Sequence, residues 1–187
     1  IEDELAHAGI CVVRAADYEA DDVLATIAQT AYDAELPSVL VTDDRDVWQC
    51  VRCNAQTGLF VAACESPGMR LVGPLGVEQA LGVPPSRVVD YFALLGGKNN
   101  IPGVPGIGEV WAAKIASLVS VAELVGEAAC ETLEGIGNAP ETAEGRAILA
   151  KVARVFAPAE AARLSLALAR LRTDVPLGDK ARAILTP

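Results

Sequence analysis

Ile101-Pro-Gly-Val-Pro-Gly-Ile-Gly108 is followed at once by a helical run from Glu109 to Leu118. Pro102 and Pro105 fix φ and lack an N–H donor, whereas the three glycines permit positive φ, so neither a regular strand nor a regular helix can form. The stretch predicts a tight hairpin that leads into a helix N-terminus. Unpaired N–H groups and the positive end of the helix dipole bind anions there, and nucleic-acid phosphate is the commonest large anion. A plain connecting turn is the alternative.

The composition is that of a globular protein. Of the 187 residues, 52% are hydrophobic and 4% are aromatic, so small aliphatic side chains must build the core. No apolar run approaches the ~18 residues of a membrane span, and no signal-peptide pattern opens the chain. We therefore expect no membrane association and a cytoplasmic location.

The cysteines and the single histidine limit the chemistry. Five cysteines without a regular spacing predict reduced thiols. Cys50-Val-Arg-Cys53 has the spacing of a metal or redox motif, but a zinc site would need two further soft ligands. His7 lies in a predicted exposed helix, which argues against Ser-His-Asp or Cys-His catalysis.

The net charge of −10 opposes nucleic-acid binding, because duplex affinity comes mainly from Lys and Arg that neutralise phosphates. The distribution of charge matters more than its total, however. Enzymes that act on phosphodiesters can gather carboxylates around metal ions and keep a local basic strip. Basic residues do gather near the C-terminus: Arg163, Arg170, Arg172, Lys180 and Arg182.

Secondary-structure patterns predict an α/β region over residues 1–73 and a helical region over 74–187. The first region is predicted to contain three helices and four strands. The helices end at Ala8, run from Val23 to about Ala34, and end at Val51. The strands are the buried Ile10–Val13 and Ser38–Thr42, and Leu59–Ala63 and Met69–Val72. Six helices form the second: Pro74–Leu81, Pro84–Leu95, Glu109–Leu118, Val121–Glu127, Glu141–Phe156 and Pro158–Leu171.

Two groups of acidic residues follow the first two predicted strands. Glu19, Asp21 and Asp22 follow one, and Asp44 and Asp46 follow the other. Ligands of open α/β sheets bind at this edge, and five converging carboxylates would need a hard divalent cation, Mg²⁺ or Mn²⁺. Such a metal polarises a phosphoryl group and activates water, which favours phosphodiester hydrolysis. The alternative is that the aspartates merely cap helices.

Three motifs in order resemble the 5′ nuclease family, specifically the 5′–3′ exonuclease domain of bacterial DNA polymerase I. They are Tyr18-Glu-Ala-Asp-Asp-Val-Leu-Ala-Thr26, Val41-Thr-Asp-Asp-Arg-Asp46 and Asn100–Gly108. Arg163-Leu-Ser165 and Leu171–Leu177 are similar to the closing segment of that domain. The resemblance covers most of the chain. It implies a partial PIN-like (resolvase-like) parallel sheet with flanking helices, followed by a helix–three-turn–helix region similar to the SAM fold.

The family resemblance also implies a function. A member cuts DNA at a 5′ flap, nick or gap in replication and repair, as a 5′–3′ exonuclease or flap endonuclease that uses Mg²⁺ or Mn²⁺. We expect a monomer that forms part of a longer polymerase I chain. The resemblance implies metal ligands at Glu19, Asp21, Asp22, Asp44 and Asp46, of which Asp21, Asp22 and Asp44 would be catalytic. It implies a helix-hairpin-helix DNA clamp, with a possible K⁺ on its main-chain oxygens, at Gly103, Val104, Gly106, Ile107, Gly108 and Lys114.

The chain departs from the family pattern in three places. The match begins after the strand and basic arch with which relatives open, so we expect the central strand, at least one metal ligand and the basic catalytic residues to be missing. Gly96-Gly-Lys-Asn-Asn100 replaces Gly-Asp-x-x-Asp-Asn, and Asn99 could offer only a neutral oxygen in place of the second-metal aspartates. Val110 and Trp111 stand where relatives place a basic and a small polar residue, and we expect Trp111 to pack.

These departures predict a weakened second metal site and reduced nuclease activity. A catalytically inactive DNA-binding module of the same family is the alternative function. A small phosphatase-like hydrolase would share the acidic sheet edge but would have no use for the hairpin.

Overall fold

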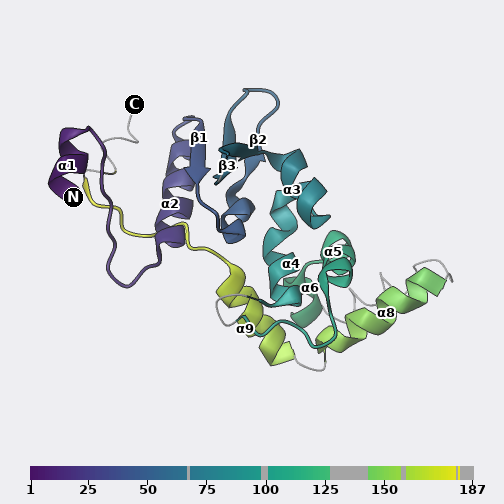
Figure 1. Cartoon of the computed structure of the whole chain (residues 1–187). Coiled ribbons are helices and arrows are strands. Elements are labelled where there is room, and N and C mark those ends of the chain that lie inside the picture. Colours follow the sequence, from purple (N-terminus) through teal and green to yellow (C-terminus); the bar gives the residue numbers. More distant parts are fainter. Residues whose placement is uncertain (67, 98–100, 127–142, 157–158, 180, 182–187) are drawn as a thin grey trace. The chain divides into compact units, whose positions relative to one another are not determined.

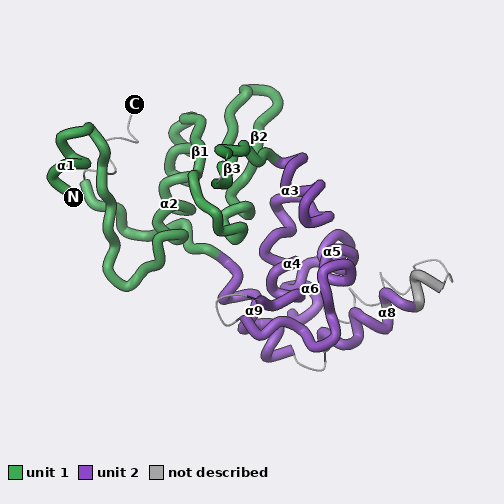
Figure 2. Tube along the Cα trace, in the orientation of Figure 1, with its two compact units in different colours: residues 1–73, 171–187 green, residues 74–170 purple. Residues whose placement is uncertain are grey.

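The computed structural model describes residues 1–66, 68–97, 101–126, 143–156, 159–179 and 181. The chain divides into two compact units, which Figure 2 colours separately. Unit 1 comprises Ile1–Gly73 and Leu171–Pro187, and unit 2 comprises Pro74–Arg170. The segment after Arg170 therefore lies with the α/β region and not with the helical region predicted over 74–187. The reason is local: the N–H groups of Leu171 and Arg172 donate to side chains of unit 1.

A small mixed sheet forms the centre of unit 1. Its strands are β1 (Ser38–Val41), β2 (Arg52–Cys53), β3 (Phe60–Glu65) and β4 (Arg70–Val72). β1 runs parallel to β3, with Ser38 opposite Val61 and Val41 opposite Cys64. β2 and β4 pair with β3 antiparallel, β2 with its first residues and β4 with its last. The strands predicted near 38–42, 59–63 and 69–72 are confirmed, whereas β2 was not predicted.

Two helical elements of unit 1 pack on this sheet. α2 (Ala20–Asp33) and the 3₁₀ helix η1 (Arg45–Cys50) cover one face through a core of Ala28, Leu40, Val47 and Val61. Aspartates in the first turn of α2 favour a helix start there, because they face the positive end of the helix dipole. β1 was predicted to be fully buried, but only Leu40 of this strand is buried. Val39 and Val41 point to the opposite face and are 44% and 57% exposed.

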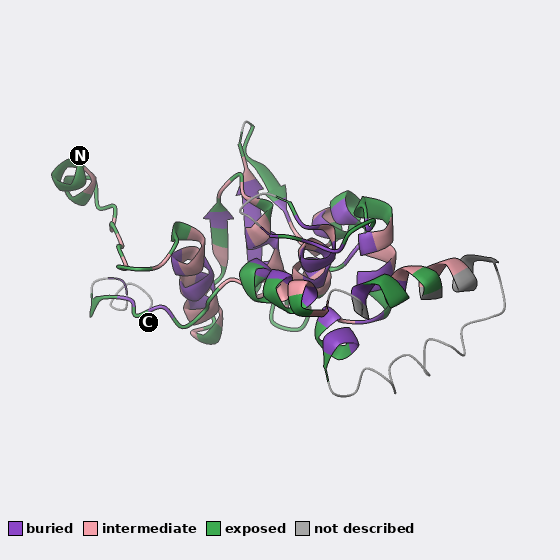
Figure 3. Ribbon diagram, turned by 90° about the horizontal axis from the view of Figure 1, so that it is seen from below, coloured by how far each residue is buried: buried purple, intermediate pink, exposed green. Residues whose placement is uncertain are grey.

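The predicted strand at Ile10–Val13 is wrong. This segment follows α1 (Glu2–His7) as an extended chain without strand pairing. A strand needs a partner for its main-chain groups, and Val13 instead packs against Val23, Val175 and Leu177. α1 itself buries no residue, and the helix beside the N label of Figure 3 is almost entirely exposed.

Unit 2 is helical. Its elements are α3 (Pro74–Leu81), η2 (Pro85–Arg87), α4 (Val88–Leu95), α5 (Glu109–Leu118), α6 (Val121–Val125), α8 (Ala143–Phe156) and α9 (Ala159–Ala169). α4, α5, α6 and α9 lie together in Figure 1. α9 buries the small residues Ala162, Ser165 and Ala169, whereas α4, α5 and α6 also bury Leu94, Ile115 and Leu124. All six predicted helices are found, the second of them divided into η2 and α4. The predicted ends at Glu127, Glu141 and Pro158 lie outside the described residues. In the described part of the chain no helix is long and apolar enough to cross a membrane.

One buried carboxylate joins two helices of unit 2. Asp90 of α4 is 7% exposed, and its Oδ1 accepts the N–H of Val121, the first residue of α6, at 2.8 Å. Its Oδ2 lies 3.4 Å from Nη1 of Arg87. Burial raises the pKa of Asp90, and the bonds to Val121 and Arg87 oppose that rise. The start of α6 therefore depends on an acceptor that is held inside the unit.

Asp90→Ala should lower the free energy of unfolding by about 1–3 kcal/mol, because the buried N–H of Val121 would lose its acceptor. Asp90→Asn should cost less, since an amide oxygen can still accept that N–H and a neutral side chain is easier to bury. Urea unfolding followed by circular dichroism measures both. Equal losses in the two variants would contradict this role of Asp90.

Candidate functional site

Asp21 and Asp44 lie close enough to repel each other. Asp21 is in the first turn of α2, and Asp44 follows the end of β1. Burial raises the pKa of Asp21, and the negative charges of Asp44, Glu19 and Asp22 raise it further. The two acidic groups that are separate in the sequence therefore meet in unit 1. A cation bound here would lower the cost of ionising Asp21.

The second acidic group is organised by local hydrogen bonds. The Oδ1 of Asp44 accepts the N–H of Asp46 at 3.0 Å and so caps η1. The N–H of Asp44 donates to the hydroxyl of Thr42 at 3.1 Å. Asp44 therefore has the capping role that we considered as an alternative. Asp21 does not, because the N-cap of α2 is Glu19, whose side chain makes no capping bond.

Asp22 fastens the C-terminal segment to α2. Its Oδ1 accepts the N–H of Arg172 at 2.8 Å. One turn later, the hydroxyl of Thr26 donates to the carbonyl of Asp22 at 2.8 Å and accepts the N–H of Val175 at 3.2 Å. The side chain of Gln49 in η1 accepts the N–H of Leu171 at 3.1 Å. Figure 1 shows the yellow C-terminal segment running past α2.

Sequence analysis did not find Thr26 or Gln49. Thr26 is 4% exposed and lies one turn after Val23, so a polar residue on the apolar face of a helix was the available signal. Its partner is 149 residues away, and no local pattern identifies it.

Two of the five basic residues predicted near the C-terminus, Arg163 and Arg172, form ion pairs. The guanidinium of Arg172 donates to both oxygens of Asp174, at 2.9 and 2.8 Å, and its centre lies 5.4 Å from the ring centre of Tyr18. This pair lowers the pKa of Asp174. Arg163 donates to Glu160 and to the carbonyl of Val125. Lys180 and Arg182 lie outside the described residues.

The acidic side chains are hard oxygen donors, the kind of ligand that a divalent cation such as Mg²⁺ prefers. Among the described residues, no group of three or more His, Cys, Asp or Glu side chains is placed to hold a metal ion. Mg²⁺, however, commonly takes only one or two carboxylates and completes its shell with water and substrate phosphate. Asp21 and Asp44 provide hard oxygen donors whose repulsion a cation would relieve. Gly97 offers no side chain to a second site, and Asn99 lies outside the described residues.

The Cys50–Cys53 pair is poorly suited to zinc or redox chemistry. Burial raises the pKa of Cys50 to about 11, so its thiol stays protonated at neutral pH, whereas metals and disulfides need the thiolate. Cys11, Cys50, Cys53 and Cys64 are free thiols, and Cys130 lies outside the described residues.

The hairpin of unit 2 is held by its apolar residues. Ile101, Val104 and Ile107 are 7%, 3% and 5% exposed, whereas the prolines between them are exposed. The N–H of Gly103 donates to the buried hydroxyl of Ser165 at 3.0 Å, and the N–H of Val104 donates to the carbonyl of Leu94 at 2.9 Å. Three of the residues that the resemblance assigned to DNA binding, Gly103, Val104 and Ile107, are therefore buried.

Close backbone contact makes glycine necessary at one point of the hairpin. Gly103 has φ +66°, and a Cβ on it would lie 2.6 Å from the nitrogen of Gly96. Gly106 and Gly108 are exposed, and Lys114 is half-buried on α5. The carbonyl of Gly106 already accepts the ammonium of Lys151 at 2.9 Å. This oxygen is a poor fit for K⁺, because a cationic side chain occupies it.

Comparison with known proteins agrees with this architecture. Residues 1–80 match the protein family described as "5′-3′ exonuclease, N-terminal resolvase-like domain". The chain is 37% identical over 171 residues to the thermostable DNA polymerase I of Thermus filiformis, an alignment that covers 90% of this chain. The chain belongs to the 5′ nuclease family. It spans 18% of the length of that polymerase.

Two solved nuclease structures share the fold. The T5 5′-exonuclease with bound zinc ions superimposes with a TM-score of 0.67 at 18% identity, over 91% of this chain and 56% of that one. A complex of the bacteriophage T5 flap endonuclease with DNA and metal ions gives a TM-score of 0.60 at 20% identity, over the same shares of the two chains. At these identities the likeness establishes the fold alone. The α/β class with a parallel strand pair, predicted from the sequence, is confirmed.

Asp21→Asn should make unit 1 more stable at pH 7. The pKa of Asp21 is raised in the folded chain, so ionisation as the pH rises costs stability that the amide does not lose. The advantage of the variant should shrink as the pH falls through the raised pKa, because protonation removes the same charge from the wild type. Thermal melts from pH 4 to pH 7 measure it, with the exposed Asp179→Asn as the charge-matched control. A variant that is less stable than the wild type at pH 7 would contradict the repulsion.

Thr26→Val should lower the free energy of unfolding by about 1–3 kcal/mol, because the buried N–H of Val175 loses its acceptor without a change in side-chain volume. Thr26→Ser keeps the hydroxyl and should lose less. Urea unfolding of the three proteins tests this. A valine variant as stable as the wild type would show that the return segment does not depend on this bond.

Proposed function

We propose that the chain carries out metal-dependent hydrolysis of DNA phosphodiesters near 5′ ends, as a 5′–3′ exonuclease or flap endonuclease in replication and repair. The observation that carries the proposal is the meeting of Asp21 and Asp44 at the end of β1, in a chain whose first 80 residues match the 5′–3′ exonuclease family. The solved relative with DNA and metal ions supports the same substrate class.

Asp21 and Asp44 would hold the divalent ion, Mg²⁺ or Mn²⁺. When bound, such an ion polarises a phosphoryl oxygen and lowers the pKa of a bound water. Glu19, Asp22 and Asp46 add negative charge around this pair and strengthen cation binding. Asp22 is held in position by the N–H of Arg172, which donates to one of its two oxygens. Asp21 and Asp44 are therefore the residues that we assign to catalysis, with Asp22 beside them.

Unit 2 would bind the duplex part of the substrate. The exposed part of the hairpin, Gly106 and Gly108, leads into α5 and brings main-chain N–H groups to the surface. Lys114 on the same helix supplies a positive charge. The substrates would be flapped, nicked or gapped duplexes, and the protein would act as a monomer within a longer polymerase I chain.

We propose that the activity is weak. Asp21 and Asp44 would supply two carboxylates, which suits a single ion. Two-metal nucleases use two ions about 3.5–4 Å apart, because one stabilises the attacking oxygen and the other the leaving oxygen. A DNA-binding module without cleavage is the second candidate function. The absence of a side chain at Gly97, where relatives carry an aspartate, favours it.

The test is cleavage of a 5′-labelled flap substrate by the purified chain in Mg²⁺ and in Mn²⁺. We expect slow cleavage that EDTA abolishes and that Asp21→Asn loses, while DNA affinity measured by fluorescence anisotropy is retained. Asp179→Asn, with the same change in charge, should cleave like the wild type.

Cleavage that survives Asp21→Asn would contradict the assigned site. Binding without any cleavage would support the inactive module, and a rate matching that of a complete two-metal nuclease would contradict the reduced activity.

A further inference from the structure

Three charged side chains form a row across one edge of the sheet of unit 1. Glu65 is the last residue of β3, Arg70 of β4 lies opposite it in the antiparallel pair, and Arg45 is the first residue of η1. Oε2 of Glu65 accepts an N–H of Arg70, and Oε1 lies 3.7 Å from Nε of Arg45. One carboxylate therefore faces two guanidinium groups, and this arginine row carries an excess of positive charge.

The arginine row lies at the same edge of the sheet as Asp44. β1 and β3 run parallel, so the residues that follow these strands leave the sheet at one edge. The N–H of Thr42 donates to the carbonyl of Cys64 at 3.1 Å, and the N–H of Ser66 donates to the carboxylate of Asp43 at 2.7 Å. These bonds hold the loop that carries Asp44 against the end of β3. The arginine row therefore lies beside the acidic site.

The guanidinium of Arg45 is available to a ligand. Its side chain is 55% exposed, and the 3.7 Å to Glu65 is longer than an N–H···O hydrogen bond, which spans about 2.7–3.2 Å. The guanidinium carbon lies 5.0 Å from the ring centre of the buried Trp48, which backs one face of the group. Within the part of the chain that the structure describes, this guanidinium makes no hydrogen bond. Its planar fork of N–H donors matches the oxygens of a phosphate.

Arg70 keeps the charge of Arg45 from being neutralised. A carboxylate carries a single negative charge, and Arg70 is the arginine that is hydrogen-bonded to Glu65. The charge of Arg45 is therefore in excess. Its neighbours in the sequence are aspartates: Asp43, Asp44 and Asp46. Because aspartates repel the phosphates of a DNA strand, a cation among them lowers that repulsion.

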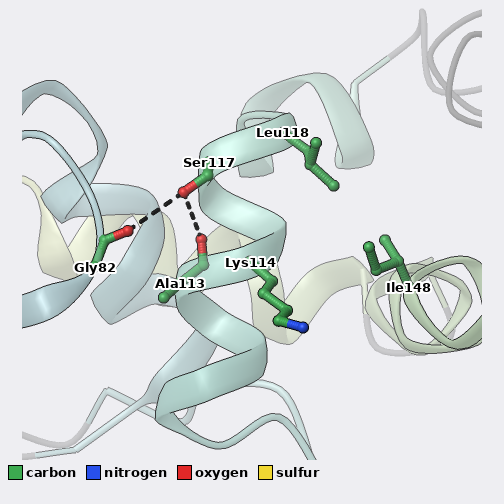
Figure 4. Close-up of a pocket in the computed structure, with 6 residues that line it drawn as sticks. All are labelled: Gly82, Ala113, Lys114, Ser117, Leu118 and Ile148. Carbon is green, nitrogen blue, oxygen red and sulfur yellow. Dashed lines mark hydrogen bonds between the residues drawn. The ribbon is translucent and has the colours of Figure 1, made fainter. Parts of the chain in front are cut away.

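The pocket of unit 2 is less suited to a phosphate. It has a volume of about 280 Å³ and is mainly apolar. Figure 4 shows the hydroxyl of Ser117 bonded to the carbonyls of Ala113 and Gly82, at 2.8 and 3.5 Å. The ammonium of Lys114 lies 5.6 Å from the ring centre of Trp111. The polar groups of this pocket therefore have partners within unit 2.

We propose that Arg45, positioned by Glu65 and Arg70, binds a backbone phosphate next to the phosphate that is cut. This inference rests on the proposed hydrolysis of DNA at the acidic site, and it assigns a substrate-binding residue to unit 1. Arg45 holds the strand at the edge of the sheet and offsets the repulsion between the strand and the aspartates. Sequence analysis quoted Arg45 within the motif Val41–Asp46 and gave it no role.

Anisotropy of a labelled 5′-flap substrate across a series of KCl concentrations tests the charge of Arg45. Ca²⁺, which also takes oxygen ligands, replaces Mg²⁺. Loss of one phosphate contact lowers the slope of log affinity against log salt concentration by about 0.7–0.9, which is roughly 5- to 8-fold in affinity at about 0.1 M salt. Arg45→Gln should show this loss, and Arg45→Lys should keep the slope because it keeps the charge. Arg14→Gln, an exposed arginine of unit 1 that pairs with Glu2, should leave the slope unchanged.

Glu65→Gln should strengthen binding. The amide oxygen can still accept the N–H of Arg70, but it no longer offsets the charge of Arg45. Glu2→Gln removes the same charge from the ion pair with Arg14 and should change the affinity less. A purely structural Glu65 predicts the opposite sign, because loss of its charge would loosen both arginines. Thermal melts confirm that each variant is folded.

Uncharged linkages in the DNA locate the contact. Each phosphate on either side of the flap junction is replaced in turn by a methylphosphonate. In the wild type, one replacement beside the junction should weaken binding by the same factor as Arg45→Gln. In Arg45→Gln that replacement should have no further effect, whereas Arg14→Gln should respond like the wild type.

The outcomes separate this inference from the proposed function. If the wild type binds the flap and every methylphosphonate has the same effect in Arg45→Gln, the phosphate contact is wrong while DNA binding stands. Weaker binding by Glu65→Gln would also contradict the contact. If one linkage loses its effect in Arg45→Gln but the wild type does not cleave in Mg²⁺, the contact stands while the proposed nuclease activity fails. If the wild type does not bind DNA, both are overturned.

Discussion

Two main-chain N–H groups, those of Arg172 and Val175, hold unit 1 together by donating to side chains of α2. Their acceptors are the carboxylate of Asp22 and the hydroxyl of Thr26, which lie one turn apart on the helix that also carries Asp21. A hydrogen bond to a carboxylate is stronger than one between neutral groups. The C-terminal segment thereby fixes the first turn of α2, and with it the carboxylates that a metal ion would use.

The acidic site works against the stability of the unit that contains it. Burial, and after it the negative charge of Asp44, raises the pKa of Asp21, so ionising Asp21 in the folded chain costs stability. Perturbed ionisable groups of this kind concentrate at functional sites, because a bound cation recovers the cost. The capping bonds of Asp44 and the anchoring bond of Asp22 keep the charges in place when no ion is bound.

Sequence patterns of a few residues predicted the elements of this fold that depend on neighbouring residues alone. The helices are found because apolar spacing, prolines and glycines act within a few residues. The segment Ile10–Val13 was mistaken for a strand, since pairing depends on a neighbour that periodicity does not reveal. β2 is too short to carry a pattern. Glu19, Asp21 and Asp22 were predicted to follow a strand that does not form, and they lie instead at the start of α2. Thr26 and Lys151 act on partners brought near only by tertiary packing.

The hydrogen bond between Asp22 and Arg172 also sets an order of events during synthesis. The two residues are 150 positions apart. At ribosomal speeds of about 5–20 residues per second, roughly 8–30 s separate the translation of α2 from that of the segment that fastens it. During that interval the aspartates are present but the first turn of α2 lacks its anchor. The acidic site is therefore completed late in synthesis, after the chain that forms unit 2 has been made.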